Sequence, residues 1–265
     1  KYQPDVFLSP DNYLSVKSKT KTVLITHDLA HIHYPNEIPF LTKKFYNYFV
    51  PKYIERADKI VTVSEFTKND IIKNYGTSKD KIEVIYNACT PSFKPSNAQE
   101  KNAIKEKFSE GQDYFFYTGA IHPRKNVDQL IKAFDHFKSK TNAPAKLLIA
   151  GRMAWKNEAV NKAYQEAKHK ADINLLGFVS NEDLVALMAS AKCFTYVSKH
   201  EGFGIPLLEA MQSGVPIITS NVSALPEVAK DAALLVDPNN MLTIANAMEK
   251  IWTDESLRQD LIQKG

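Results

Sequence analysis

The sequence has few cysteines and lacks the glycine patterns that mark several common enzyme classes. Its 265 residues include only two cysteines, Cys89 and Cys193, and neither has a second cysteine nearby. The chain therefore offers no disulfide framework and no metal site built from cysteine pairs. The patterns G-x-G-x-x-G, GxxxxGK(S/T), G-x-S-x-G and HExxH do not occur. Their absence disfavours dinucleotide oxidoreductases, P-loop ATPases, α/β-hydrolases and zinc proteases.

Long apolar runs and blocks of like charge are scarce as well. No run approaches the ~20 apolar residues that a membrane span needs, and no signal-peptide pattern opens the chain. Together with the low cysteine content, this predicts a cytoplasmic protein. No block of five or six like charges indicates a nucleic-acid-binding arm, so we expect no nucleic acid partner.

The positive charge that is present lies in the first part of the chain. The net charge is +4, and residues 1–95 hold 14 Lys and Arg against 10 Asp and Glu, which accounts for the whole excess. A basic first part suits an anionic acceptor or a peripheral contact with the inner face of an anionic membrane. An ordinary lysine-rich solvated surface is the simpler interpretation, and the sequence leaves both open.

Apolar segments of strand length alternate with helical patterns along most of the chain. The first part contains expected strands at 4–10, 22–28, 59–64 and 81–86, with an amphipathic helix at about 39–56. The second part contains expected strands at 114–118, 146–150, 173–176, 193–198, 215–219 and 232–236, separated by helices. Continuous apolar strands that alternate with helices predict the α/β class, with parallel sheets covered by helices.

The chain is long enough for two domains, at roughly 150 residues each. Residues 87–112 are rich in Pro, Asn, Lys and Ser, so we expect a linker zone there. We place the domains at residues 1–90 and 91–265. The second has the six strands of a complete Rossmann-like domain, whereas the first has only about four.

The stretch EGFGIPLLEAM, residues 201–211, follows one of the expected strands and opens a helix. Glycines let a backbone approach a ligand closely, and Pro206 suits the first helical turn. The amide groups and dipole of a helix N-terminus attract anions. Glu201 in the loop and Glu209, expected in the first helical turn, bracket this site. Amides for phosphates and carboxylates for hydroxyls are the groups that a sugar nucleotide requires.

The same stretch resembles the E-x7-E signature of the retaining group 1 (family-4) glycosyltransferases of the GT-B fold. The upstream segment TGAIHPRKN, residues 118–126, is similar to the donor-phosphate loop of that family. The downstream segment GVPIITSNVSALPEV, residues 214–228, is similar to its next strand and loop. The Pro-Arg-Lys-Asn and Ser-Ala-Leu-Pro-Glu variants look most like bacterial mannosyltransferases.

The resemblance implies a GT-B enzyme with two Rossmann-like domains facing a cleft, an acceptor-side N-terminal domain and a donor-binding C-terminal domain. Against the family, part of the N-terminal domain and the closing helix would be missing. The implied activity is metal-independent transfer of a hexose, with mannose the first candidate, to a hydroxyl acceptor in polysaccharide or glycolipid synthesis. The donor would be a GDP- or UDP-linked sugar, used as a co-substrate, and no cofactor is expected. The acceptor would be a glycan or a lipid-linked sugar.

The resemblance also implies roles for individual residues. Glu201 would position the donor sugar, and Lys125 and Arg124 would stabilise the departing diphosphate. The family often places an arginine directly after the strand glycine, where this chain has Ala120, so Arg124 would have to reach the phosphate from the next turn. The implied catalytic residues are His27, Arg124, Lys125 and Glu201, and the implied donor-binding residues are Gly119, Phe203, Gly204, Ile205, Pro206, Leu207 and Glu209.

Other interpretations remain open at this point. His27, Asp28, His31 and His33 form the pattern H-D-x-x-H-x-H, whose side chains suit zinc or iron, but no further ligands stand out and we expect no metal. The chain could be a donor-binding fragment without activity. It could also be a nucleotide-sugar epimerase or a phosphorylase on the same fold, although no pyridoxal phosphate motif is evident.

Overall fold

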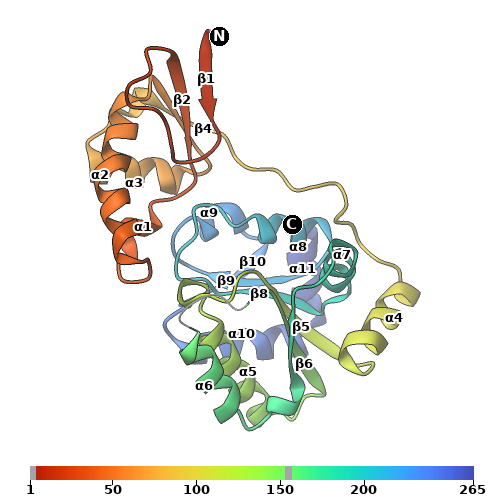
Figure 1. The fold of residues 1–265 in the computed structure, drawn as a ribbon. Coiled ribbons are helices and arrows are strands. Elements are labelled where there is room, and N and C mark those ends of the chain that lie inside the picture. The colour runs from red at the N-terminus through yellow and green to blue at the C-terminus, as the bar shows by residue number, and fades with distance from the viewer. Residues whose placement is uncertain (1–3, 153–156) are drawn as a thin grey trace. The chain divides into compact units, whose positions relative to one another are not determined.

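The computed structural model describes residues 4–152 and 157–265. The chain divides into two compact units (Figure 1). The first contains Lys1–Asn87 together with the short segment Glu201–Phe203, and the second contains Ala88–His200 and Gly204–Gly265. Among the described residues, no helix has both the length and the apolar character needed to cross a membrane.

The first unit is a four-stranded parallel sheet with helices between its strands. The strands follow the order β1-β2-β3-β4, and β1 pairs with β2. The elements of this unit are β1 (Val6–Ser9), β2 (Lys21–Thr26), α1 (Ala30–His33), α2 (Phe40–Arg56), β3 (Lys59–Thr62), α3 (Glu65–Tyr75), η1 (Lys79–Lys81) and β4 (Ile82–Val84). Its core joins Leu24, Ile60 and Ile82 of the sheet to Ile54 of α2 and Ile71 of α3.

The second unit is a six-stranded sheet whose pairings are all parallel. Its strands are β5 (Asp113–Thr118), β6 (Ala145–Ala150), β7 (Ile173–Gly177), β8 (Cys193–Tyr196), β9 (Ile217–Ser220) and β10 (Ala233–Val236). Its helices are α4 (Ala98–Ser109), η2 (Pro123–Lys125), α5 (Val127–Thr141), α6 (Glu158–Glu166), η3 (Lys170–Asp172), α7 (Asn181–Ser190), α8 (Ile205–Gln212), α9 (Leu225–Ala229), α10 (Met241–Thr253) and α11 (Glu255–Lys264).

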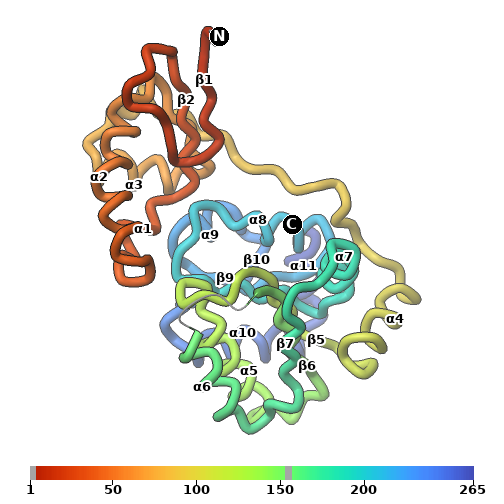
Figure 2. Tube along the Cα trace, in the orientation of Figure 1, coloured from red at the N-terminus to blue at the C-terminus, as the bar shows by residue number. Residues whose placement is uncertain are grey.

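Helices cover both faces of this second sheet. Every residue of β6 is buried, which requires cover on both faces. Helix α5 packs against α6 and α10, and these three helices lie together in Figures 1 and 2. Helix α7 packs against α4 and α8 in a second group. The apolar spacing of α5 places Leu130, Ile131 and Phe134 in the core, as the period of a helix predicts.

Helix α4 lies inside the segment that the sequence predicts to be a linker, and that prediction is wrong for residues 98–109. The helix begins with a capping box: the Asn97 side chain accepts from the Glu100 N–H, and the Glu100 carboxylate accepts from the Asn97 N–H. Such a cap satisfies two amide groups that the first turn would otherwise leave unpaired. The pattern Asn-x-x-Glu was therefore a readable start signal within a polar stretch.

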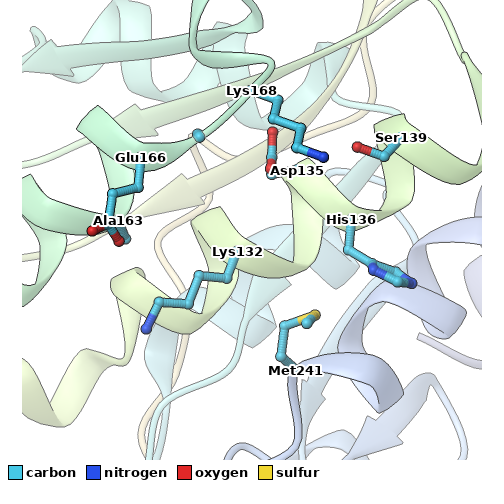
Figure 3. A pocket seen from close by; sticks show the side chains of 9 residues that line it. Lys132, Asp135, His136, Ser139, Ala163, Glu166, Lys168 and Met241 are labelled. Carbon is cyan, nitrogen blue, oxygen red and sulfur yellow. The ribbon is translucent and has the colours of Figure 1, made fainter.

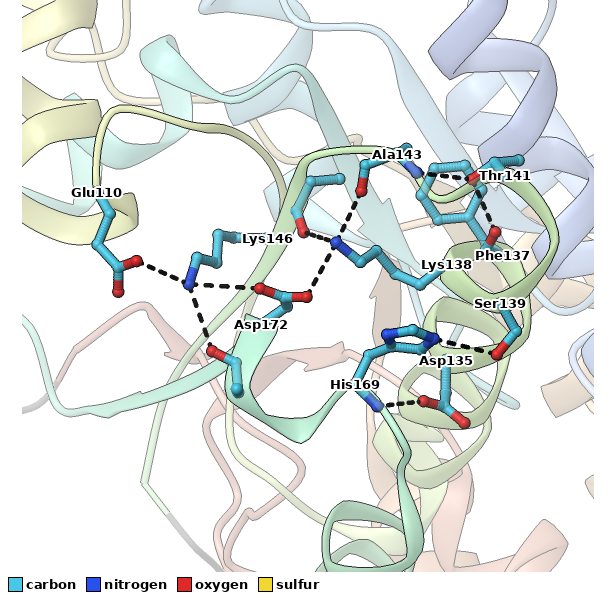
Figure 4. Close-up of polar contacts among 12 residues, drawn as sticks. Glu110, Asp135, Phe137, Lys138, Ser139, Thr141, Ala143, Lys146, His169 and Asp172 are labelled. Atoms are coloured by element: carbon cyan, nitrogen blue, oxygen red, sulfur yellow. Dashed lines mark hydrogen bonds and ion pairs between the residues drawn. The ribbon is translucent and has the colours of Figure 1, made fainter.

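Two buried lysines meet one carboxylate near the amino end of β6 (Figure 4). Lys138 Nζ lies 2.9 Å from Asp172 Oδ2 and donates to the carbonyl of Ala143 at 2.7 Å. Lys146 Nζ lies 3.4 Å from Asp172 Oδ1 and 3.1 Å from a carboxylate oxygen of Glu110. Burial raises the pKa of Asp172, but the two ammonium groups outweigh it, so the pKa lies below its ordinary value. This cluster fastens α5, β6 and η3 to one another.

Candidate functional site

The two loops singled out by the sequence leave the second sheet at one point. The strand order is β10-β9-β8-β5-β6-β7, so the chain proceeds from β5 to β7 on one side and returns with β8 on the other. Ligands of open parallel sheets bind at the carboxyl ends of the strands, where the order reverses. The loop after β5 contains Gly119, Arg124 and Lys125, and the loop after β8 leads to Gly204. The topology therefore places both at the switch point.

The loop after β5 starts with two glycine backbones in contact. Gly119 has φ +142° and donates its N–H to the carbonyl of Ala150. A Cβ atom on Gly151, the residue after β6, would lie 1.9 Å from the carbonyl oxygen of Gly119. No side chain fits there, so the two strand ends can run side by side and the loop turns immediately after the sheet.

Arg124 joins the loop after β5 to the loop after β8. Its guanidinium donates to the carbonyl of His200 at 3.3 Å, and its own carbonyl accepts from the Lys199 N–H at 2.8 Å. The His122 ring accepts from the Arg124 N–H at 3.3 Å and caps η2. These contacts hold the short η2 turn against the segment that leads to Glu201.

Lys125 lies over a stack of aromatic rings. Its Nζ donates to Tyr196 Oη at 2.7 Å and lies 5.2 Å from the centre of that ring. Tyr196 is buried and stacks on Tyr117 of β5 and Phe194 of β8. The phenol thus fixes the direction of the ammonium group at the carboxyl ends of the two central strands. Sequence reasoning assigned Tyr196 only to a strand.

Asn126 is a second residue whose part in the site the sequence analysis missed. It is fully buried and takes the left-handed conformation, with φ +63°. Its amide nitrogen donates to the carbonyl of Val197 at 3.0 Å and to that of Pro238 at 2.7 Å. Asn126 therefore joins the loop that contains Lys125 to the segment after β8 and to the loop before α10. Asparagine tolerates the left-handed region better than other non-glycine residues, so its position before a helix was a usable signal.

The helix of the signature begins with Gly204 in the left-handed region, φ +105°. Helix α8 follows with Ile205 exposed and Pro206 in its first turn, while Leu207 is buried in the core. Helix α8 is the next element after β8 in the chain, and the unpaired N–H groups of a helix start can bind an anion.

Glu209 lies in the second turn of α8, so the sequence prediction of a first-turn glutamate is wrong. The helix starts at Ile205, and its first turn contains no acidic residue. Partial burial raises the pKa of the Glu209 carboxyl above its ordinary value. Burial and the Glu209 carboxylate also raise the pKa of the Cys89 thiol, which places Cys89 within electrostatic reach. The macrodipole acts mainly on the first turn, so it does not explain this glutamate.

In the first unit, His27 directly follows β2. Its side chain is exposed, and Nε2 is 2.9 Å from the carbonyl oxygen of Pro10. The segment Glu201–Phe203 belongs to this same unit. The Ser64 hydroxyl, which caps α3, donates to the carbonyl of Gly202 at 2.7 Å. A Cβ atom on Gly202 would lie 1.9 Å from the carbonyl oxygen of His27, so only glycine permits this approach.

In the segment Glu201–Phe203, the side chains of Glu201 and Phe203 are both buried. The Phe203 ring lies 5.9 Å from the ring of Tyr86, just beyond β4. The structure therefore groups His27, Glu201 and Phe203 in the first unit. It groups Gly119, Arg124, Lys125, Gly204, Ile205, Pro206, Leu207 and Glu209 in the second.

The histidines of the H-D-x-x-H-x-H pattern have separate partners. His33 Nε2 is 2.7 Å from Asp70 Oδ2, and His31 Nε2 is 3.2 Å from Tyr75 Oη. Burial lowers the pKa of His31 below its ordinary value. Within residues 4–152 and 157–265, no group of three or more His, Cys, Asp or Glu side chains is arranged to hold a metal ion.

A hollow of about 340 Å³ lies elsewhere in the second unit, between α5, α6 and the start of α10 (Figure 3). Lys132, Asp135 and His136 of α5 line it together with Lys168 and Met241. None of the residues predicted for donor binding borders it, and its mixed charges do not favour an anionic ligand. It is therefore separate from the candidate site.

Two family models match the chain, one in each part. Residues 98–265 match the model described as "Glycosyl transferases group 1", and residues 1–93 match "Glycosyltransferase Family 4". The chain is 31% identical over 265 residues to the O-antigen chain mannosyltransferase B of Escherichia coli, covering all of this chain and 69% of that protein. It is 29% identical to the O-antigen chain mannosyltransferase RfbU of Salmonella typhimurium, covering 89% of this chain and 61% of that protein.

Solved structures agree on the fold. The lipopolysaccharide glycosyltransferase WaaG is 18% identical with a TM-score of 0.75, covering 93% of this chain and 72% of that one. Anabaena Alr3699/HepE in complex with UDP-glucose is 17% identical with a TM-score of 0.78, covering 92% of this chain and 66% of that one. These likenesses confirm the α/β class and the GT-B fold predicted from the sequence. The chain is therefore a member of the group 1 glycosyltransferases and resembles the bacterial mannosyltransferases among them.

Proposed function

We propose that the protein is a retaining glycosyltransferase that moves a hexose, with mannose the first candidate, from a GDP- or UDP-linked donor to a hydroxyl acceptor. The acceptor would be a glycan or a lipid-linked sugar in polysaccharide or glycolipid synthesis. The observation that carries this proposal is the switch point of the second unit. There, the loop with Arg124 and Lys125 follows β5, and the chain after the neighbouring strand β8 leads to Gly204 and the start of α8.

In the proposed reaction, the bond between the anomeric carbon and the diphosphate oxygen breaks first. Lys125, Arg124 and the amide groups at the start of α8 would stabilise the negative charge that develops on the leaving diphosphate. The acceptor hydroxyl would attack from the face that the diphosphate leaves, which retains the configuration. Its proton would pass to an oxygen of the departing phosphate. No covalent bond to the enzyme and no metal ion takes part in this scheme.

The remaining predicted residues would bind and orient the donor. Glu209 would accept hydrogen bonds from the ribose hydroxyls, and Gly119 would leave room for the nucleotide beside β5. Glu201 and His27 would contact the hydroxyl groups of the donor sugar. Two relatives that catalyse mannosyl transfer to O-antigen chains, by their names, support mannose and a glycan acceptor.

The test begins with calorimetric titration of the protein with GDP, UDP and ADP, in wild type and Glu209→Ala. We expect one diphosphate to bind far more tightly than the others and expect Glu209→Ala to lose that binding. Glu249→Ala is the matched control, because Glu249 of α10 pairs with Lys140 of α5, away from the switch point. A folded protein that binds none of the diphosphates would remove the donor site and the proposed function with it.

Turnover distinguishes the remaining alternatives. A donor-binding fragment without activity is the second candidate. The chain spans 69% and 61% of the length of two mannosyltransferase relatives. A fragment would bind the nucleotide but transfer no sugar to a lipid-linked acceptor. If transfer occurs, it should persist in EDTA, because the proposed reaction needs no metal ion. An epimerase would alter the donor sugar in the absence of acceptor, and a phosphorylase would absorb near 400 nm through bound pyridoxal phosphate. Transfer with an unchanged anomeric configuration, measured by NMR, supports the proposal.

A further inference from the structure

Another hollow in the second unit lies at the amino ends of three neighbouring strands, β5, β8 and β9. Its volume is about 240 Å³, and residues of α4 and α11 line it from the two sides. We call it the α4–α11 hollow. The three strands are six, four and four residues long, so about 13–20 Å of sheet lies between this hollow and the carboxyl ends of the strands. None of the residues predicted for the donor site lines it.

The charged groups around the α4–α11 hollow are unequal in number. Four cations line it and only two carboxylates, namely Lys101, Lys105, Lys192, Arg258, Asp113 and Glu255. Four positive charges and two negative charges leave an excess of two positive charges. The exposed fraction of the side chain is 22% for Lys105, 19% for Lys192 and 11% for Arg258. The excess charge is therefore largely withdrawn from water.

The cluster of buried lysines near the amino end of β6 differs in this respect. There, Lys138 and Lys146 face two carboxylates, Asp172 and Glu110, so the charges are equal in number. A structural cluster of this kind is complete by itself. The α4–α11 hollow lacks the anion that would complete it, and an uncompensated charge that is withdrawn from water costs free energy.

The lysines of the hollow keep N–H donors that the protein does not use. Lys105 Nζ and Lys192 Nζ lie 2.5 Å and 2.9 Å from the two carboxylate oxygens of Asp113. An ammonium group has three N–H donors, and in the described part of the chain Asp113 is the one hydrogen-bond acceptor of either lysine. Lys101 lies one turn before Lys105 on α4 and forms no ion pair with any described carboxylate. All three ammonium groups can therefore donate to a further anion.

The other two charged groups of the hollow lie on α11. The Arg258 guanidinium donates to the carbonyls of Ile251 and Trp252 and pairs with Glu255, so its position is fixed and its charge is constant. Burial raises the pKa of Asp113, but its hydrogen bonds with Lys105 and Lys192 outweigh that effect, so the pKa lies below its ordinary value. Asp113 is thus charged at neutral pH, and it is already counted in the excess of positive charge.

A phosphate dianion matches this excess better than other common anions. Its charge equals the excess, and its terminal oxygens can accept hydrogen bonds from several ammonium groups at once. A carboxylate ligand would bring only one negative charge. The hollow is smaller than the roughly 300 Å³ at which pockets for larger organic ligands begin, so its size favours a small ligand over a nucleotide.

We propose that the α4–α11 hollow binds a phosphate dianion, either inorganic phosphate or the phosphate group of a small phosphomonoester, with Lys101, Lys105 and Lys192 donating to its oxygens. Arg258 adds positive charge from α11. The bound anion joins α4 to the start of β8 and therefore stabilises the second unit. This site is separate from the donor site, and the binding does not depend on sugar transfer.

The test is calorimetric titration of the 265-residue protein with inorganic phosphate, glycerol 3-phosphate and acetate. We expect at least one of the two phosphates to bind about tenfold or more tightly than acetate, because a dianion gains twice the Coulomb energy of a monoanion. The tighter of the two phosphates identifies the source of the group. The melting temperature should rise with the concentration of that ligand, as mass action requires for a ligand of the folded state.

Four variants locate the binding. Lys101→Gln should weaken phosphate binding by about tenfold, the effect of losing one hydrogen bond to a charged group. Lys107→Gln is the matched control on the same helix, because Lys107 is 56% exposed, pairs with Asp183 and does not line the hollow. It should weaken binding by less than about twofold. Glu255→Gln removes a negative charge and should tighten binding by about three- to tenfold. Lys125→Ala, at the opposite ends of the strands, should leave binding in the hollow unchanged.

Several results would overturn the proposal. One is a folded wild type that binds neither phosphate, and another is an equal loss of binding in Lys101→Gln and the Lys107→Gln control. Equal affinity for acetate would show a non-specific charge effect. Loss of all phosphate binding in Lys125→Ala would place the anion in the loop after β5 instead. Circular dichroism of every variant establishes that the fold is intact. Because the titration contains no nucleotide sugar, failure in the hollow leaves the proposed sugar transfer standing.

Discussion

The two ends of the strands in the second sheet hold cations in different surroundings. Near the amino end of β6, Lys138 and Lys146 are buried and share the carboxylate of Asp172. At the carboxyl ends of β5 and β8, Arg124 donates to a backbone carbonyl and Lys125 to a phenol. The first pair of cations lies in the framework of the unit, and the second lies in loops beside the start of a helix.

From this difference we infer that the buried lysines serve the fold, and we propose that the loop cations serve a ligand. Buried ammonium groups need a fixed anion, because an uncompensated buried charge strongly destabilises a protein. Cations in loops at the carboxyl ends of the strands can respond to an anion that arrives from solution. Substitutions at the amino end should therefore change the free energy of unfolding and leave nucleotide affinity alone. Substitutions at the carboxyl end should weaken nucleotide binding or sugar transfer and leave the free energy of unfolding nearly unchanged.

The largest expected effect is that of Lys125→Ala on turnover. Loss of a cation that stabilises developing charge typically lowers kcat by about 10²- to 10³-fold. We expect such a drop in sugar transfer with little change in melting temperature. Lys132→Ala is the matched control, since Lys132 is half exposed on α5 and pairs with Asp128. An equal drop in both variants would contradict the assignment.

Tyr196→Phe refines the same prediction. It removes the oxygen that accepts from Lys125 and keeps the ring that stacks on Tyr117 and Phe194. If the phenol serves mainly to direct the ammonium group, kcat should fall by about five- to tenfold, which corresponds to about 1–1.4 kcal/mol and lies in the range of one ordinary hydrogen bond. Thermal unfolding should stay close to that of wild type.

The next largest effect is that of Asp172→Asn on stability. Removal of the carboxylate leaves two buried lysines with less compensation, and we expect a loss of about 2–3 kcal/mol in the free energy of unfolding in urea. The donor affinity should be unchanged. As a control, Glu249→Gln breaks the more exposed Lys140 pair and should cost less than about 0.5 kcal/mol.

Acid unfolding tests the same cluster in a second way. Because the lysines hold the pKa of Asp172 below its ordinary value, its stabilisation is complete above the unfolded pKa and is lost as the pH falls through the lower, folded one. Wild type should therefore lose its advantage over Asp172→Asn below about pH 4. A constant difference between pH 7 and pH 2.5 would contradict this account.

A smaller effect is expected for Asn126→Gly, which should change both the free energy of unfolding and the affinity for nucleotide. Glycine keeps the left-handed backbone but removes the amide that donates to Val197 and Pro238. We expect a loss of about 1–2 kcal/mol in stability together with weaker binding of the nucleoside diphosphate. Asn126→Ala should cost about 1 kcal/mol more, because alanine disfavours the left-handed region. Equal stabilities of the two variants would show that the backbone conformation is unimportant.

The sequence predicted what depends on local pattern. Spacing over a few residues was enough to predict the strands that precede Gly119 and Glu201. It also predicted the buried face of α5 and the helix of the signature. The alternation of strands and helices was enough for the α/β class, and the motif was enough for the family. The roles of His27, Arg124, Lys125, Glu201 and the donor-binding residues remain predictions.

What the sequence could not show depends on contacts between distant residues. Asn126 reaches Val197 and Pro238, which are 71 and 112 positions away, and no local pattern reports such pairs. Lysine is rarely buried in proteins, so the burial of Lys138 and Lys146 beside Asp172 was not expected. Glu209 was placed one turn too early, because the E-x7-E spacing does not say where the helix begins.

The smallest expected effect is the dependence of nucleotide affinity on pH through Glu209. Partial burial raises the pKa of this carboxyl above its ordinary value of 4.5, so the charged form that would accept the ribose hydroxyls is complete only at higher pH. Affinity for the selected diphosphate should rise a few-fold as the pH increases through that raised pKa.

The phosphates of the ligand titrate too, so the informative quantity is the difference between wild type and Glu209→Gln. The neutral amide should remove this step and keep the fold. Because burial disfavours the charged form, Glu209→Gln should also unfold no more easily than wild type at pH 8, which separates a ligand-binding carboxylate from a structural one such as Asp172. Parallel pH profiles for the two proteins would instead show that Glu209 does not contact the ribose.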